Sequence, residues 1–129
     1  MIAARIFAAA AFAVALVTAA GPARADYLNL ECSDTRQTEW NAEHKPGIIY
    51  WVDLDKQTIT WVAILNGEFD PRTVQTHSVQ ITPEAFNFSV GQFTANVNRL
   101  TGDNYWNGPG GTQHYVCSKG ARPFPTGLF

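Results

Sequence analysis

The sequence predicts an all-β fold: a small antiparallel meander of about seven strands that forms a closed or partly closed barrel. Short runs of alternating or β-branched apolar residues are separated by turn residues such as Asn66-Gly67 and Thr82-Pro83. No stretch keeps a helical period over three turns. The links are short, which favours hairpins between consecutive strands, and the runner-up is a two-sheet sandwich.

The predicted strands have period two or are rich in β-branched and aromatic residues. In chain order they are 26–32, 48–53, 58–65, 73–81, 85–90, 93–100 and 112–119. The clearest runs from Phe93, with Ala95, Val97 and Arg99 on the same face and a turn at 101–103. The polar segment 33–47 is predicted to be a loop with one helical turn near 38–44.

Residues 1–25 have the pattern of a secretory signal peptide. A basic start is followed by an Ala-rich apolar run, and Ala23-Arg24-Ala25 supplies a small-x-small cleavage pattern. The apolar run is too short for a good membrane anchor, so we expect no membrane span after its removal. Residues 26–129 then form a single β domain in the periplasm or outside the cell.

The charge of the mature chain argues against two classes of partner. Without Arg5 and Arg24, the 9 basic residues fall to seven against 11 acidic ones, a net charge of about −4. Nucleic acids and anionic membrane surfaces both bind basic faces, so neither is an expected partner.

Cys32 and Cys117 are the only cysteines. In an oxidising compartment such a pair is most simply a disulfide, and here it joins the first and last predicted strands. Pairing of those strands is what closure of a barrel requires.

The segment Val97-Asn98-Arg99-Leu100-Thr101-Gly102 lies between a hairpin turn at 53–55 and the terminal cysteine. With these features, 48–117 resembles small secreted bacterial β-meander proteins that have one disulfide and an Arg-x-Thr-Gly turn. The resemblance implies an exported β-meander, and it implies no activity. The general plan is also similar to lipocalin and avidin barrels, although their ligand motifs are not present.

Motifs for catalysis, metals and cofactors do not occur in the sequence. His44, His77 and His114 have no spacing suited to a metal. There is no Gly-x-Ser-x-Gly elbow, and the Gly-rich segment 108–111 is not followed by the Lys-Ser/Thr of a phosphate loop. We therefore expect no catalytic residues, no metal ligands and no cofactor.

Arg99 is the first of three candidate binding residues. If Phe93, Ala95 and Val97 face inward, Arg99 points inward at the strand end, where a guanidinium needs a partner. In the first interpretation, which we call the end plug, Arg99 fills the end of the barrel, and its guanidinium pairs with Asp103 or stacks on a Trp. The other is an anchor for an anion or carboxylate at the barrel mouth.

Tyr105 and Trp106 are the other two candidate binding residues, and they lie in a predicted loop over 103–111. This loop is rich in glycine, so it has too few side chains to bury both rings within itself. In one reading they fold back as a lid on the core; in the other they stand at the surface as contact residues, with Trp106 as anchor.

These patterns favour an exported, non-enzymatic module that binds a small ligand or a protein partner, such as an inhibitor of a secreted hydrolase. The alternative is a structural or envelope-associated domain with no discrete ligand, and a hydrolase comes third. A deep apolar cavity would favour ligand binding, whereas a filled core with an exposed aromatic loop would favour a protein partner.

Overall fold

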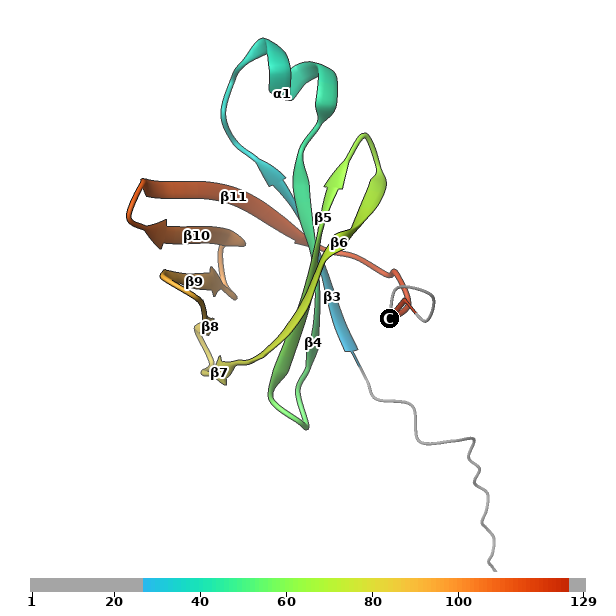
Figure 1. Ribbon diagram of the computed structural model, residues 1–129. Helices are drawn as coiled ribbons and strands as arrows, with labels where there is room; N and C mark the ends of the chain where they lie inside the picture. The colour runs from blue at the N-terminus through green and yellow to red at the C-terminus, as the bar shows by residue number, and fades with distance from the viewer. Residues whose placement is uncertain (1–26, 126–129) are drawn as a thin grey trace, which may run out of the picture.

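The computed structural model describes residues 27–125, which form one antiparallel sheet of nine strands. The strands are β3 (Tyr27–Asp34), β4 (Gly47–Asp53), β5 (Thr58–Leu65), β6 (Glu68–Ser78), β7 (Gln80–Ile81), β8 (Ala85–Val90), β9 (Phe93–Asn98), β10 (Asp103–Gly108) and β11 (Gly111–Lys119). The sheet curls strongly into a half-barrel (Figure 1). This confirms the all-β meander, and because all nine strands share one sheet, the two-sheet alternative is not adopted.

The two halves of the sheet meet where the first and last strands pair. Neighbouring strands follow the order β6-β5-β4-β3-β11-β10-β9-β8-β7. Cys32 lies directly opposite Cys117 in the β3–β11 ladder, and the two form the predicted disulfide. The sheet ends at β6 and β7, which follow one another in the chain through Val79, so the half-barrel is open along this seam.

The structure differs from the sequence prediction at two strands. The predicted strand 73–81 is part of a longer β6 and a separate, short β7. The segment 103–111 was expected to be a loop, and this is wrong: 103–108 is strand β10, paired with both β9 and β11. Its inward positions are Asn104 and Trp106, so one of them is polar and the apolar alternation that predicts a strand is missing.

The predicted helical turn is confirmed as α1 (Glu39–His44), which lies between β3 and β4. Thr38 caps it, because its Oγ1 accepts a hydrogen bond from the Asn41 backbone N–H at 3.0 Å. Lys45 ends it in the left-handed conformation. The helix buries none of its residues, and the chain returns to the sheet directly after it.

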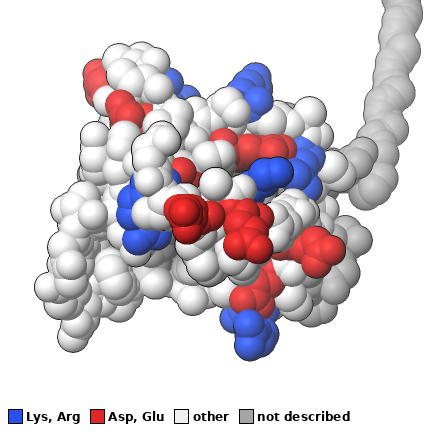
Figure 2. Space-filling model, turned by 90° about the horizontal axis from the view of Figure 1, so that it is seen from above, with Lys and Arg blue, Asp and Glu red and all other residues white. Residues whose placement is uncertain are grey.

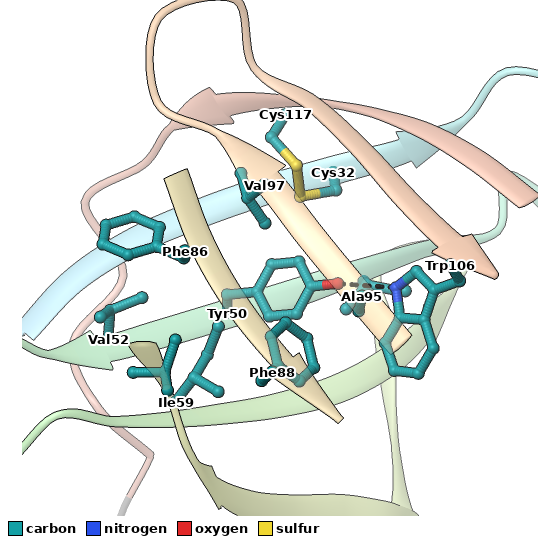
Figure 3. Close-up of a cluster of buried hydrophobic side chains, with 12 residues drawn as sticks. Cys32, Tyr50, Val52, Ile59, Phe86, Phe88, Ala95, Val97, Trp106 and Cys117 are labelled. Carbon is teal, nitrogen blue, oxygen red and sulfur yellow. Dashed lines mark hydrogen bonds between the residues drawn. A yellow bond between two sulfur atoms is a disulfide. The ribbon is translucent and has the colours of Figure 1, made fainter. Parts of the chain in front are cut away.

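The concave face of the sheet carries the main core (Figure 3). A hydrogen-bonded chain crosses this core: Trp106 Nε1 donates to Tyr50 Oη at 2.9 Å, and Tyr50 Oη donates to Asn104 Oδ1 at 2.8 Å. Asn104 Nδ2 donates to the Asn96 carbonyl oxygen at 2.8 Å. Burial raises the pKa of Tyr50, so the phenol stays neutral and its hydroxyl proton is available to this chain.

A second apolar cluster covers the outer face of β4 and explains why every residue of this strand is buried. Trp51 lies at its centre, with Phe69 from β6 and Phe124 from the C-terminal segment as edge-to-face neighbours. The Trp51 Nε1 donates to the Arg122 carbonyl oxygen at 3.1 Å. Trp51 does not meet Trp61 across the β4–β5 hairpin, because Trp61 lies opposite Tyr50 and shares the concave face with it.

The proposed signal peptide lies outside the described residues. Within 27–125, no helix is long and apolar enough to cross a membrane. On the face drawn in Figure 2, basic and acidic side chains are intermixed in the middle of the view, further acidic side chains lie at the upper left, and the lower left is uncharged. This face therefore offers no basic surface of the kind that nucleic acids bind.

Candidate functional site

A hollow of about 440 Å³ opens at one end of the half-barrel, and we call it the mouth pocket. Its volume falls within the range of small-molecule sites. Side chains from both halves of the sheet line it, including Trp61, Ala63, Val90, Phe93, Trp106 and Tyr115. Strand alternation places them together, because each occupies a concave-face position of its own strand.

The aromatic wall of the mouth pocket is built around Trp106. The Trp106 ring makes edge-to-face contacts with Trp61, Phe88 and Phe93, with centroid distances of 5.3, 5.6 and 6.1 Å. Edge-to-face packing is the favoured arrangement of such rings. The hydrogen bond from Nε1 to Tyr50 holds the indole from below. The wall is therefore held in place by its contacts with the core.

Trp61 contributes a feature that packing alone does not explain. Its Nε1 is buried and has no hydrogen-bond acceptor among the described residues. A buried donor without an acceptor costs free energy, which is why such groups are uncommon in native proteins. This donor belongs to a ring that lines the mouth pocket, and it is the one such side-chain atom in the described chain.

Polar groups complete the rim of the mouth pocket on two sides. Gln113 and Gln75 carry neutral amides, and Asp70 is the one charged residue among the lining side chains. A hydrogen bond from Arg72 lowers the pKa of Asp70, so this carboxylate is ionised and already paired at neutral pH. The rim therefore offers amides and a neutralised carboxylate, with no cation of its own.

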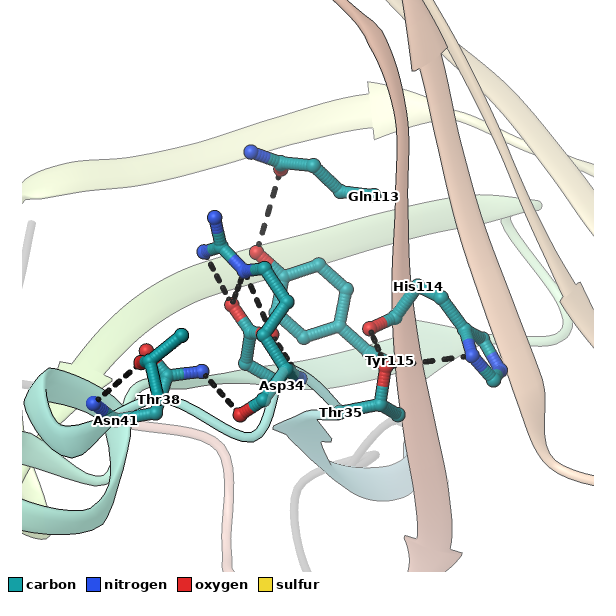
Figure 4. Close-up of polar contacts among 8 residues, drawn as sticks. Asp34, Thr35, Thr38, Asn41, Gln113, His114 and Tyr115 are labelled. Carbon is teal, nitrogen blue, oxygen red and sulfur yellow. Dashed lines mark hydrogen bonds and ion pairs between the residues drawn. The ribbon is translucent and has the colours of Figure 1, made fainter.

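The loop between β3 and α1 braces the rim (Figure 4). Arg36 holds Asp34 in a two-point ion pair whose shortest contact is 2.6 Å, and the Asn41 Nδ2 donates to the Arg36 carbonyl oxygen at 3.0 Å. Tyr115 lies beside this pair, and burial raises the pKa of its phenol. The Tyr115 hydroxyl donates to Gln113 Oε1 at 3.4 Å.

The structure does not bring the three predicted binding residues together. Trp106 is 7% exposed and lies in the core and the mouth pocket wall. Tyr105 is 37% exposed on the opposite face of β10, where its ring stacks on His114 at 4.5 Å. Adjacent strand residues point to opposite faces, which separates this pair. The expectation of one loop carrying both rings is therefore wrong.

Arg99 lies at the far end of β9 from the mouth pocket. It is exposed, which corrects the expectation of a buried guanidinium. Its guanidinium carbon lies 4.7 Å from the centroid of the Phe86 ring, and Nη1 donates to the Thr82 carbonyl oxygen at 2.7 Å. The ring beneath the guanidinium is Phe86, where the end-plug interpretation expected a Trp. Asp103, its suggested partner, pairs with His114 instead.

The pair of His114 and Asp103 is the arrangement closest to catalytic chemistry in the described chain. His114 Nε2 lies 2.9 Å from Asp103 Oδ1, and the Thr35 hydroxyl lies 3.4 Å from Nδ1. However, the Thr35 hydroxyl donates its one proton to the His114 carbonyl oxygen at 3.0 Å. Tyr105 covers a face of the imidazole. These residues therefore form a surface hydrogen-bond network that contains no activated nucleophile. No cluster of metal-binding side chains occurs within 27–125.

Comparison of the chain with protein-family models, with curated proteins and with solved structures finds no match. The candidate site therefore rests on the geometry of this chain. Sequence reasoning identified Trp106 but missed Trp61, Phe93 and Tyr115 as members of one wall. They come from three separate strands, and only the register of the sheet brings them together.

Proposed function

We propose that this protein is an exported, non-enzymatic module that binds a small, mainly apolar ligand in the mouth pocket. The observation that carries the proposal is a preformed aromatic wall of Trp61, Phe93, Trp106 and Tyr115 around a hollow of about 440 Å³. Ligand sites are typically concave, apolar and preformed, with a few polar groups that set orientation.

The polar groups around the mouth pocket indicate the kind of ligand. An uncharged molecule with a hydrogen-bond acceptor fits best, because the unpaired Trp61 Nε1 supplies a donor and the rim supplies amides from Gln75 and Gln113. An anion is disfavoured, because Asp70 is the one charged lining residue.

The other functions receive less support from the same residues. An inhibitor or protein-binding module was expected to use an exposed aromatic loop at 103–111, and Trp106 instead lies in the core. A hydrolase needs an activated nucleophile in a cleft, and the His114 network lies on the outer face. The buried disulfide supports export, because such bonds persist in oxidising compartments.

A cavity-filling variant tests the proposal. Ala63 is half-buried and lines the mouth pocket, so Ala63→Leu should occupy part of the hollow while keeping the core intact. The probe is N-phenyl-1-naphthylamine, an uncharged apolar dye whose fluorescence increases in dry sites. We expect enhancement with the wild-type protein and little with Ala63→Leu.

Ala42→Leu is the matched control, because it makes the same change on the exposed face of α1, away from the lining residues. It should bind the dye as the wild type does. Absence of dye binding by the folded wild type, or equal binding by Ala63→Leu, would contradict the proposal.

A further inference from the structure

A second hollow, of about 350 Å³, opens at the other end of the half-barrel, and we call it the turn pocket. The turn between β9 and β10 forms one side of it, and β3, β8, β9 and β11 supply the rest. Its apolar floor consists of Leu28, Leu30, Phe86 and Val97. The mouth pocket lies at the opposite end of β9, because Phe93 lines that pocket whereas Val97 and Asn98 line this one.

The turn pocket has a one-sided charge. Arg99 and Lys119 both line it, and no acidic residue is among its lining side chains. The whole chain has a formal net charge of −2, so the positive charge of this pocket is opposite in sign to that of the protein. Lys119 occupies a concave-face position opposite Leu30, so its side chain leaves the strand on the same face as the apolar floor.

Arg99 differs from the other arginines of the described chain. Arg36, Arg72 and Arg122 each form an ion pair with a carboxylate, and those contacts measure between 2.6 and 3.0 Å. Within 27–125, Arg99 has no carboxylate partner. Asp103 is only four residues away, yet its two oxygens contact His114 and Thr101.

The guanidinium of Arg99 is nevertheless held in place. One Nη1 hydrogen bond to the Thr82 carbonyl oxygen and the stack over Phe86 fix its position, and most of its five N–H donors stay available. The turn that carries it is also well defined: Asn98 Oδ1 accepts the backbone N–H groups of Leu100 and Thr101 at 2.8 and 3.0 Å. Gly102 has φ +84°, and a side chain there would collide with Cys117.

We propose that the turn pocket is a second binding site, which takes a small amphipathic carboxylate. The carboxylate head lies between Arg99 and Lys119, and the short apolar chain lies on Leu28 and Leu30, which are half-buried. Arginine presents paired N–H groups that match a carboxylate, and charge-assisted hydrogen bonds are the stronger kind. The proposal does not depend on the function of the mouth pocket.

Titration with octanoate, followed by backbone amide NMR, tests this site. We expect octanoate to shift the amide signals of Leu30, Val97 and Gly102. Octanol, which has the chain without the charge, and acetate, which has the charge without the chain, should each produce much smaller shifts. Arg99→Gln and Lys119→Gln should each raise the octanoate Kd about tenfold, the effect of losing one charge-assisted hydrogen bond.

Two control variants test whether octanoate binding depends on the position and the charge of the substituted residue. Lys45→Gln removes a cation next to α1, outside the turn pocket lining, and should leave the octanoate Kd unchanged. Arg99→Lys keeps the positive charge and should bind more tightly than Arg99→Gln. If octanol shifts the same amides as strongly as octanoate, or if Arg99→Gln and Lys119→Gln both keep the wild-type Kd, the carboxylate site is refuted.

Discussion

The two ends of the half-barrel differ in chemistry, although β8, β9 and β11 contribute to both. At the mouth pocket, β9 begins with Phe93 beside Trp106; at the turn pocket, the chain leaves β9 with Arg99 over Phe86. The mouth pocket has four aromatic rings and two neutral amides among its lining residues, whereas the turn pocket has aliphatic side chains, one ring and two cations.

The difference shows how strand alternation distributes function. A concave face carries side chains at period two, so one strand serves both ends and the residue at each end sets the local chemistry. The middle of the concave face is filled by the Tyr50, Asn104 and Trp106 chain of hydrogen bonds. Because side chains fill the centre of the concave face, the two pockets are separate. Substitutions in one pocket should therefore leave the other pocket unchanged.

The largest effect is expected from Trp106→Ala, which removes the centre of the mouth pocket wall. Burial in the core predicts a loss of about 3 kcal/mol or more of unfolding free energy, the usual cost of truncating a buried Trp. Tyr105→Ala, its neighbour on the outer face, should cost under about 1 kcal/mol. Denaturant unfolding of both variants measures the contrast, and equal losses would mean that the two rings are not on opposite faces.

The next effect concerns the joint between the two halves. The disulfide joins β3 to β11 across a sequence separation of 85, and Cys117 also lines the turn pocket. The double variant Cys32→Ala, Cys117→Ala should lose roughly 2–5 kcal/mol of unfolding free energy, the usual cost in small secreted domains. Mass spectrometry of the wild type should find no alkylatable thiol. An unchanged denaturation midpoint would show that strand pairing alone holds the joint.

A smaller effect is expected from Tyr50→Phe, which alters the region between the pockets. Loss of the hydroxyl leaves Asn104 and Trp106 each without this partner, at a cost of about 1–3 kcal/mol. Burial raises the pKa of Tyr50 in the folded state. The resulting stability is complete below the unfolded pKa, about 10, and is lost as the pH rises above it.

The stability difference between wild type and Tyr50→Phe should therefore narrow in alkaline solution. Thermal unfolding at a series of pH values from neutral upward measures it, with Tyr115 present in both proteins as a common background. If the stability difference between wild type and Tyr50→Phe stays constant above pH ~10, Tyr50 is accessible to water.

The sequence predicted the strands whose concave positions are apolar and missed the one whose inward positions are partly polar. Phe86, Phe88, Ala95 and Val97 alternate clearly, so β8 and β9 were placed correctly. In β10 the inward Asn104 forms its side-chain hydrogen bonds with residues of two other strands, and the pattern within β10 does not contain that information. The pairing of Cys32 with Cys117 was predictable, because no other cysteine exists.

The pockets were harder to predict than the fold, for a physical reason. Arg99 and Trp106 were both identified, yet the structure assigns them to opposite ends. Their separation depends on the register between β9 and β10, in which Trp106 lies opposite Ala95. Strand register depends on many weak cross-strand contacts, and no single residue of this chain specifies it.

The smallest effect is expected from Asp103→Asn, which tests why Arg99 has no carboxylate. The hydrogen bond from His114 lowers the pKa of Asp103, so its contribution to stability is present above the unfolded pKa and is lost as the pH falls into the acid range. The difference in thermal midpoint between wild type and Asp103→Asn should therefore shrink from pH 7 towards pH 3. Because Asp103 belongs to the outer face, the variant should keep the wild-type octanoate Kd at the turn pocket. Tighter octanoate binding by Asp103→Asn would contradict this expectation. It would show that the Asp103 carboxylate competes with octanoate for the Arg99 guanidinium.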